Sequence, residues 1–171
     1  MSDVPPPVPY PDASALDRAG ELIRAAAYPV VVVGLECGAG PEATWLLAFA
    51  ESLPAPVLTT ARAGGVFPDS HPLGLGSLPG GDTEKAVMDR ADLVVMLGVG
   101  PEELTPTGLS CPAPVIRLAR TPHPGPAAPL VQVTGEVGAI LEEMAPRLRG
   151  RTRANWDVAL LDRLKRGPTA L

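Results

Sequence analysis

Continuous apolar runs alternate with amphipathic segments along most of this 171-residue chain. The clearest run, PVVVVG at 29–34, is β-branched and ends in glycine. A run that is apolar at successive positions is typical of a strand buried on both faces of a parallel sheet. Four more runs predict strands at 55–60, 92–100, 113–119 and 129–135.

Segments with helical periodicity lie between and around these strands. We expect Ser14 to cap the first helix, with Asp17 in a capping-box-like role three residues later. Its apolar face consists of Leu16, Ala19, Leu22, Ile23 and Ala26. Further helices are predicted at 41–53, at 82–91 (capped by Asp82 or Thr83), at 136–148 and at 155–167 (capped by Asn155).

The alternation of helix and strand predicts an α/β, Rossmann-like fold with three layers. We expect a mainly parallel sheet of five to six strands, of the DHS-like NAD/FAD-binding type, with helices on both faces. Residues 1–12 are Pro-rich and predict a linker, residues 13–150 a single α/β domain, and residues 151–171 a C-terminal linker and helix. The 22 prolines and 18 glycines cluster between the apolar runs, as loop residues do.

The last predicted helix carries four large apolar side chains, and two interpretations of them stay open. They could form a contact between copies of this chain, or they could pack back on their own domain. The residues are Trp156, Leu160, Leu161 and Leu164.

Charge and cysteine content exclude several classes of partner. The net charge of −5 disfavours a nucleic-acid-binding surface. Cys37 and Cys111 do not make a disulfide framework, which fits a reducing compartment. The apolar runs are too short to span a bilayer, and the first 20 residues lack the pattern of a signal peptide. We therefore expect a cytoplasmic protein that binds neither nucleic acid nor membranes.

The loops after the predicted strands are the places where a ligand would bind in such a sheet. The first of them contains Gly34, Gly38 and Gly40 in a G-x-x-x-G-x-G pattern, which differs from the G-x-G-x-x-G fingerprint. Its glycines could receive a phosphate through backbone N–H groups, or they could form a purely structural turn.

No catalytic constellation or metal site is expected. Cys37 precedes a helix, but the histidines, His71 and His123, stand beside prolines with no motif that pairs them with it. The two histidines and two cysteines show no metal-ligand spacing. Four carboxylates lie at predicted strand ends or in loops, where surface solvation is the default interpretation: Glu36, Asp69, Glu102 and Glu103.

Taken in order, several segments resemble the central domain of thiamine-diphosphate-dependent enzymes of the acetolactate synthase, benzoylformate decarboxylase and oxalyl-CoA decarboxylase group. They are RAGELIRAAAYPVVVVG, LPAPVLTTARAGGVFPDSHPLGLG, ADLVVMLGVG and GEVGAILEEM, covering roughly residues 13–148. The resemblance implies that 57–76 is the long loop which runs along the nucleotide cleft in relatives that carry FAD or ADP in this domain.

The resemblance also implies two partner domains, in cis or in trans. One binds the thiamine pyrimidine and the other binds the diphosphate and Mg²⁺ through a GDG motif, which this chain lacks. The chain would then be a non-catalytic part of a lyase- or transferase-type enzyme, either an excised domain or a split subunit, and inactive alone. A homo-oligomer is also possible.

The nucleotide-binding positions that the resemblance implies are Gly34, Gly38, Gly40, Thr59, Thr60, Gly64, Gly98 and Gly100. Two family features are missing, because Gly100 stands where relatives have an arginine and Ala119 stands near the position of an acidic ribose partner. We therefore expect a cleft that is empty or binds FAD or ADP weakly. The alternatives are a stand-alone FAD-, ADP- or CoA-binding module and an accessory subunit like the epsilon subunit of CO dehydrogenase/acetyl-CoA synthase.

Overall fold

A six-stranded parallel sheet forms the centre of the protein. The computed structural model describes residues 7–38, 41–78, 81–100, 103, 112–121, 129–150 and 152–166. The strands are β1 (Pro29–Val33), β2 (Val57–Thr59), β3 (Gly74–Ser77), β4 (Leu93–Leu97), β5 (Val115–Ala119) and β6 (Val131–Thr134). Their order is β3-β2-β1-β4-β5-β6, and each neighbouring pair is parallel. The predicted α/β, Rossmann-like architecture is confirmed.

The two central strands explain why the apolar runs are continuous. Every residue of β1 and of β4 is buried, since helices or loops cover both faces of the sheet. The register pairs Val33 with Leu97, so the two strands end side by side. The chain leaves β1 toward β2 and reaches β4 from β3, and the strand order therefore reverses between β1 and β4. In open α/β sheets this reversal is where ligands bind.

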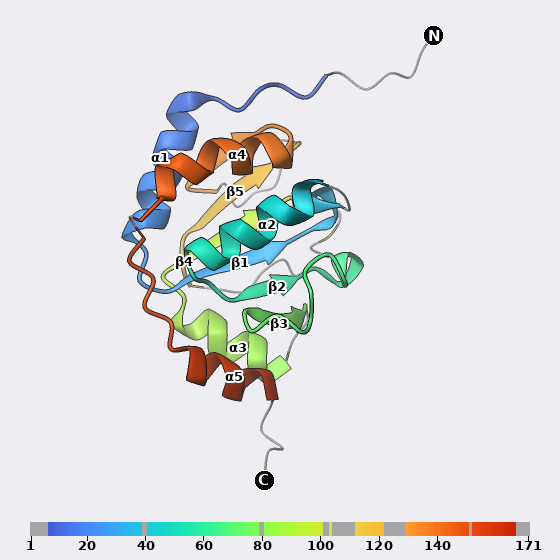
Figure 1. Ribbon diagram of the computed structural model, residues 1–171, viewed down its shortest axis with the longest axis vertical. Helices are drawn as coiled ribbons and strands as arrows, with labels where there is room; N and C mark the ends of the chain where they lie inside the picture. Colours follow the sequence, from blue (N-terminus) through green and yellow to red (C-terminus); the bar gives the residue numbers. More distant parts are fainter. Residues whose placement is uncertain are drawn as a thin grey trace.

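The helices are α1 (Ala13–Ala25), α2 (Pro41–Ser52), α3 (Gly81–Arg90), α4 (Val137–Leu148) and α5 (Val158–Arg166). Figure 1 shows α2 and α4 side by side over the sheet, with α1 next to α4 and with α3 and α5 together near β3. Short 3₁₀ turns follow β1 at Leu35–Cys37 and β2 at Ala61–Ala63. None of the helices in the described ranges combines the length and the hydropathy that a bilayer crossing requires.

The expectation for residues 57–76 was wrong in one respect. The stretch 57–76 was predicted to be a strand followed by a long loop, yet residues 74–77 form the edge strand of the sheet, beside β2. Its four residues, GLGS, include two glycines, so neither length nor β-propensity marks it as a strand. The loop proper is therefore the part between β2 and β3.

Three helix caps also differ from the prediction. Helix α3 begins at Gly81, so Asp82 and Thr83 lie inside its first turn and neither is its N-cap. Asp12, not Ser14, caps α1, and its carboxylate accepts hydrogen bonds from the Ser14 hydroxyl (2.5 Å) and the Ala15 N–H (3.0 Å). These bonds lower the pKa of Asp12. Asp157, not Asn155, caps α5 by accepting a hydrogen bond from the Ala159 N–H at 2.9 Å. At α1 and α5 the sequence offers several capping residue types in a row.

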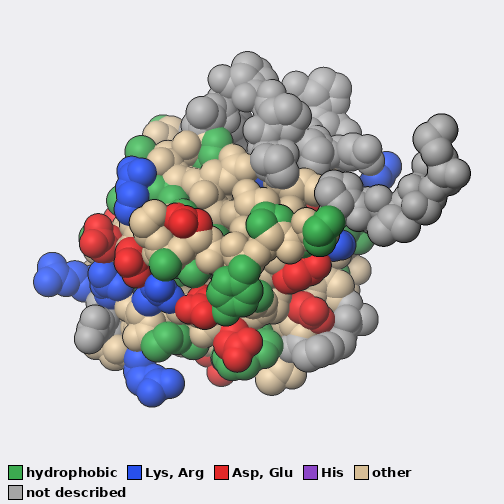
Figure 2. All heavy atoms as spheres, turned by 90° about the horizontal axis from the view of Figure 1, so that it is seen from above, with side chains coloured by type: hydrophobic (Ala, Val, Ile, Leu, Met, Phe, Trp, Pro, Cys, Tyr) green, Lys and Arg blue, Asp and Glu red, His purple; other side chains and the backbone are tan. Residues whose placement is uncertain are grey.

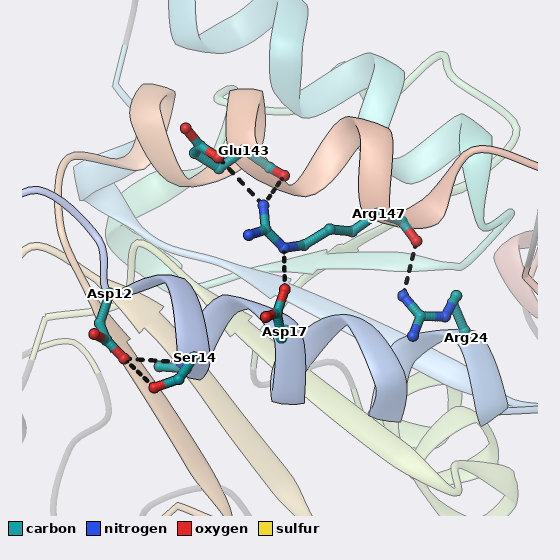
Figure 3. Close-up of polar contacts among 7 residues, drawn as sticks. Asp12, Ser14, Asp17, Arg24, Glu143 and Arg147 are labelled. Atoms are coloured by element: carbon teal, nitrogen blue, oxygen red, sulfur yellow. Dashed lines mark hydrogen bonds and ion pairs between the residues drawn. The ribbon is translucent and has the colours of Figure 1, made fainter.

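A polar seam joins α1 to α4 (Figure 3). Arg147 donates from Nε to the Asp17 carboxylate at 2.9 Å and from Nη1 to the Glu143 carbonyl at 2.7 Å. Arg24 donates to the carbonyl of Arg147 at 2.9 Å. Asp17 thus pairs across the helix interface, where a capping-box role was expected. Tyr10 donates to the Glu143 carboxylate at 2.6 Å, so the described end of the Pro-rich segment is fastened to α4.

The segment before α5 returns to the domain at the amino ends of the central strands. The Trp156 side chain is 6% exposed, donates from its indole N–H to the Pro29 carbonyl at 2.8 Å, and contacts Tyr28 edge-on. Leu161 is fully buried, and Leu164 packs against the core. Of the two interpretations of the C-terminal apolar residues, the packing therefore favours contact with the chain's own domain.

Truncation of Trp156 should destabilise the fold without altering the oligomeric state. We expect Trp156→Ala to lower the free energy of unfolding by roughly 3–5 kcal/mol, because a large buried side chain and its hydrogen bond are lost. Val158→Ala, at a position 56% exposed, should change it by less than about 0.5 kcal/mol. Denaturant unfolding and size-exclusion chromatography measure the two properties. Unchanged stability with dissociation of a dimer would contradict the assignment.

Candidate functional site

The candidate site lies at the carboxyl ends of β1 and β4, where the strand order reverses. Gly34 follows β1, and a Cβ atom at this position would lie 2.5 Å from the Gly98 carbonyl oxygen and 2.6 Å from the Val99 Cα. Real Cβ atoms do not approach this closely, so the glycine is required for the backbones to pass each other. Gly34 thus has a packing role that is independent of any ligand.

Two other predicted glycines have conformations that favour glycine. Gly98 has φ +66°, and a Cβ there would lie 2.7 Å from the Cys37 Sγ. Gly38 has φ +43° and ends the turn after β1. Both sites use glycine for the tight return of the chain between strand and helix. Gly40 lies outside the described residues.

The carboxylate of Glu103 connects the loops that follow three strands. Its Oε1 accepts hydrogen bonds from the Leu35 N–H at 2.8 Å and from the Thr60 hydroxyl at 2.7 Å. Its Oε2 accepts from the Gly100 N–H at 2.6 Å. Leu35 follows β1, Thr60 follows β2 and Gly100 follows β4. The structure thus gathers Gly34, Thr60 and Gly100, all predicted site residues, around one acidic side chain.

Thr59 and Gly64 belong to a different part of the edge. The Thr59 hydroxyl lies 2.9 Å from the Ser77 hydroxyl, and a Cβ on Gly64 would lie 3.6 Å from the same oxygen. These residues link β2 and its following loop to the edge strand β3. The predicted nucleotide-binding set therefore divides into a group at β1 and β4 and a group at β2 and β3.

Arg117 is a buried charged residue near the carboxyl ends of the strands, and it was not among the expected site residues. It lies on β5, is 3% exposed, and donates from Nη2 to the Val99 carbonyl at 2.7 Å and from Nη1 to the Thr121 carbonyl. Burial lowers its pKa, and the negative charges of Glu36 and Glu103 oppose that shift. The signal was present in the sequence, because an arginine inside the apolar run VIRLA is rarely buried without partners.

Glu36 brings a second carboxylate to the same place. Its two oxygens accept hydrogen bonds from the Arg120 N–H at 2.7 Å and the Thr121 hydroxyl at 3.3 Å. A Cβ on Gly100 would lie 3.8 Å from a carboxylate oxygen of Glu36 and 3.5 Å from one of Glu103. The site is therefore acidic. No group of three or more metal-ligating side chains occurs among the described residues.

Cys37 has the environment of a structural thiol. Its side chain is buried and donates to the Leu97 carbonyl at 3.2 Å. Burial raises the pKa of the thiol to about 12, whereas a nucleophilic cysteine needs a lowered pKa. The helix that follows does not offset this desolvation. Cys111 lies outside the described residues.

His71 is engaged elsewhere. Its Nε2 lies 2.9 Å from the Glu51 carboxylate, and its Nδ1 accepts a hydrogen bond from the Leu73 N–H at 3.1 Å. Lys165 of α5 donates to the carbonyls of His71 (2.8 Å) and Asp69. Both ring nitrogens thus have partners other than Cys37, and the cluster fastens the β2–β3 loop to α2 and α5. His123 and Glu102 lie outside the described residues.

The surface charges are mixed. On the face shown in Figure 2, several Lys and Arg side chains lie together at the left beside acidic ones, and Asp and Glu side chains lie across the centre and right. This distribution agrees with the net charge of −5.

Comparison with protein families gives a match over most of the chain. A family model described as the central domain of thiamine pyrophosphate enzymes matches residues 16–144. A sulfoacetaldehyde acetyltransferase from Rhodobacter capsulatus is 40% identical over 94 residues, which is 54% of this chain and 16% of that protein. An acetolactate synthase from Mycobacterium bovis is 31% identical over 151 residues, which is 81% of this chain and 24% of that protein. The chain thus spans a quarter or less of the length of these relatives.

Solved structures show the same arrangement. A putative thiamin diphosphate-dependent enzyme from Mycobacterium smegmatis superimposes with a TM-score of 0.70 at 30% identity, covering 91% of this chain and 31% of that one. Benzoylformate decarboxylase from Polynucleobacter necessarius also gives a TM-score of 0.70, with the same coverage. At 24% identity, the second match concerns the fold alone.

Cys37 should be unreactive in the folded protein. In a Cys111→Ser variant, where Cys37 is the remaining cysteine, we expect almost no modification by a thiol reagent at pH 8, because burial keeps the thiol protonated and covered. Modification should become complete once denaturant unfolds the chain. Mass spectrometry of samples quenched over time measures both rates. Rapid modification of the native protein, at the rate of a free thiol, would contradict this assignment.

Proposed function

The chain belongs to the family of thiamine pyrophosphate enzyme central domains, and we propose that it serves as the structural, non-catalytic central domain or split subunit of such an enzyme. The parent enzyme would be of the decarboxylase or carboligase type, that is, a lyase or transferase. Its partners would be the pyrimidine-binding and diphosphate-binding domains, in cis or in trans. We also propose that it works in the cytoplasm and that its nucleotide cleft is empty or weakly binding.

The hydrogen bonding of Glu103 is the observation that carries this proposal. The N–H groups of Leu35 and Gly100, at the carboxyl ends of β1 and β4 where ligands bind in such sheets, already donate to this carboxylate. Arg117, the buried cation at this edge, donates to two backbone carbonyls. A nucleotide phosphate would therefore find its donors in use and a carboxylate in its place. The described residues do not fit FAD or ADP at the β1–β4 position.

Thiamine diphosphate and Mg²⁺ do not fit the described residues either. Magnesium is bound through carboxylates and substrate phosphates, and the described part of the chain holds no cluster of such ligands. The chain also lacks a GDG sequence. We therefore propose that the partner domains bind these cofactors. The greater length of the relatives leaves room for such domains.

The purified chain should show no bound cofactor and no turnover. We expect an absorption spectrum from 250 to 500 nm without a flavin band, and no adenine nucleotide or CoA released on denaturation. With added thiamine diphosphate, Mg²⁺ and a 2-oxo acid, neither decarboxylation nor carboligation should occur, because the described residues include no catalytic constellation and the thiamine-binding domains are supplied by the partners in our proposal. The control for the cofactor assay is the same protein mixed with FAD and then desalted.

Two results would contradict different parts of this proposal. Turnover by the chain alone would overturn its non-catalytic role. Co-purification of FAD, ADP or CoA would overturn the empty cleft and would favour the alternative of a nucleotide-binding module or accessory subunit. Recovery of turnover on addition of separately produced partner domains would support the split-subunit form.

A further inference from the structure

Three hydrogen-bond donors from separate loops converge on Glu103. They are the Leu35 N–H, the Gly100 N–H and the hydroxyl of Thr60, a residue that is 1% exposed. A buried N–H group or hydroxyl that lacks a partner costs free energy, so the buried Thr60 hydroxyl in particular needs an acceptor here. A bound anion is one such acceptor, and here the acceptor belongs to the chain.

The surrounding backbone leaves little space for a second acceptor. A Cβ on Gly34 would lie 2.7 Å from the Glu103 Oε2 as well as within 2.6 Å of the Gly98 carbonyl oxygen and the Val99 Cα. The carboxylate thus lies in direct contact with the ends of β1 and β4. A phosphate could reach these N–H groups only if the Glu103 side chain moved away.

The charges near Gly100 also disfavour the binding of a phosphate. The Glu36 carboxylate also lies near Gly100, so an incoming phosphate would meet two negative charges. The buried Arg117 guanidinium, which donates to the carbonyls of Val99 and Thr121, offsets one of these charges, so the three side chains together still leave a net negative charge. Like charges at short range in a partly buried site repel strongly.

We propose that Glu103 is an internal substitute for a bound anion, and that its carboxylate determines that this domain does not accept a phosphate-bearing ligand. The side chain performs the structural task of joining the β1, β2 and β4 loops and at the same time excludes a nucleotide. This inference rests on the proposed function and adds the residue responsible for the empty cleft.

Substitution of Glu103 should lower the thermal stability of the domain and make that stability respond to added anions. We expect Glu103→Ala to lower the Tm, since three donors lose their acceptor, and to respond to inorganic phosphate or ADP at millimolar concentration by a rise in Tm. Phosphate should bind roughly tenfold or more tightly than to the unmodified chain, about the contribution of one charged hydrogen bond. Thermal unfolding and calorimetric titration measure these effects.

Glu21→Ala is the matched control, because it removes one negative charge from an exposed position on α1. If phosphate raises the Tm of Glu103→Ala and Glu21→Ala equally, the effect is one of net charge, and the inference is wrong. Glu103→Gln serves if the alanine variant does not fold. It keeps the side-chain volume and removes the charge, so it should gain a smaller phosphate response that still exceeds that of Glu21→Ala.

A measurement on the unmodified chain completes the test. In an NMR titration with ADP, the amide signals of Leu35 and Gly100 should stay unchanged. If they shift in a saturable way, a ligand displaces Glu103 and the inference fails. Failure of the Glu103 variants to gain any phosphate response, with an unmodified chain that is free of nucleotide and inactive, would refute the inference and leave the proposed function in place.

Discussion

Strands β1 and β4 end side by side, and their following loops pass each other so closely that no Cβ fits at Gly34. This close approach determines how the loops are arranged at the carboxyl ends of β1, β2 and β4. It brings the N–H groups of Leu35 and Gly100 into one small space, together with the Thr60 hydroxyl from the loop after β2. Donors that converge in a partly buried place must be satisfied together, and a carboxylate with two oxygens can do so.

The same constraint explains the glycine-rich character of the edge. Gly98 turns with φ +66° and lets Cys37 approach, which buries the thiol and raises its pKa. A glycine pattern after a strand is commonly associated with phosphate binding, since glycine exposes backbone donors. Here the glycines allow backbone to approach backbone and side chain, and their number says little about a ligand. The pattern in the sequence is compatible with both uses.

The sheet was the most predictable part of the structure, since β1 and β4 are runs of large apolar residues buried on both faces. Strand β3 was not predicted, because Gly74 and Gly76 interrupt any apolar pattern in it. Its place in the sheet comes from its pairing with β2. The caps at Asp12 and Asp157 were displaced by two residues because neighbouring residues are equally able to cap.

The meeting of the loops at the candidate site could be predicted from the sequence, but the contacts made there could not. That the loops after β1, β2 and β4 would meet follows from the parallel fold, and Thr60 and Gly100 were expected there. The role of Glu103 depends on its position beside the ends of β1, β2 and β4, and no local pattern in the sequence encodes that position. Arg117 could have been noticed, because a charge within a buried strand needs partners. Its carbonyl acceptors, on Val99 and Thr121, become neighbours only in the folded chain.

In our proposal, this domain does without a nucleotide because the chain itself supplies the acceptor that a ligand would supply. The need at the β1–β4 edge is for acceptors, and Glu103 meets it within the chain. Similar contacts are made at the amino ends of β1 and β4. Asp92 accepts hydrogen bonds from the N–H groups of Ala27 and Tyr28, and Trp156 donates to the Pro29 carbonyl. Side chains of the domain thus make hydrogen bonds to the backbone at both ends of the central strand β1. These contacts stabilise β1 at its two ends, and in our proposal the cofactors are bound by the partner domains.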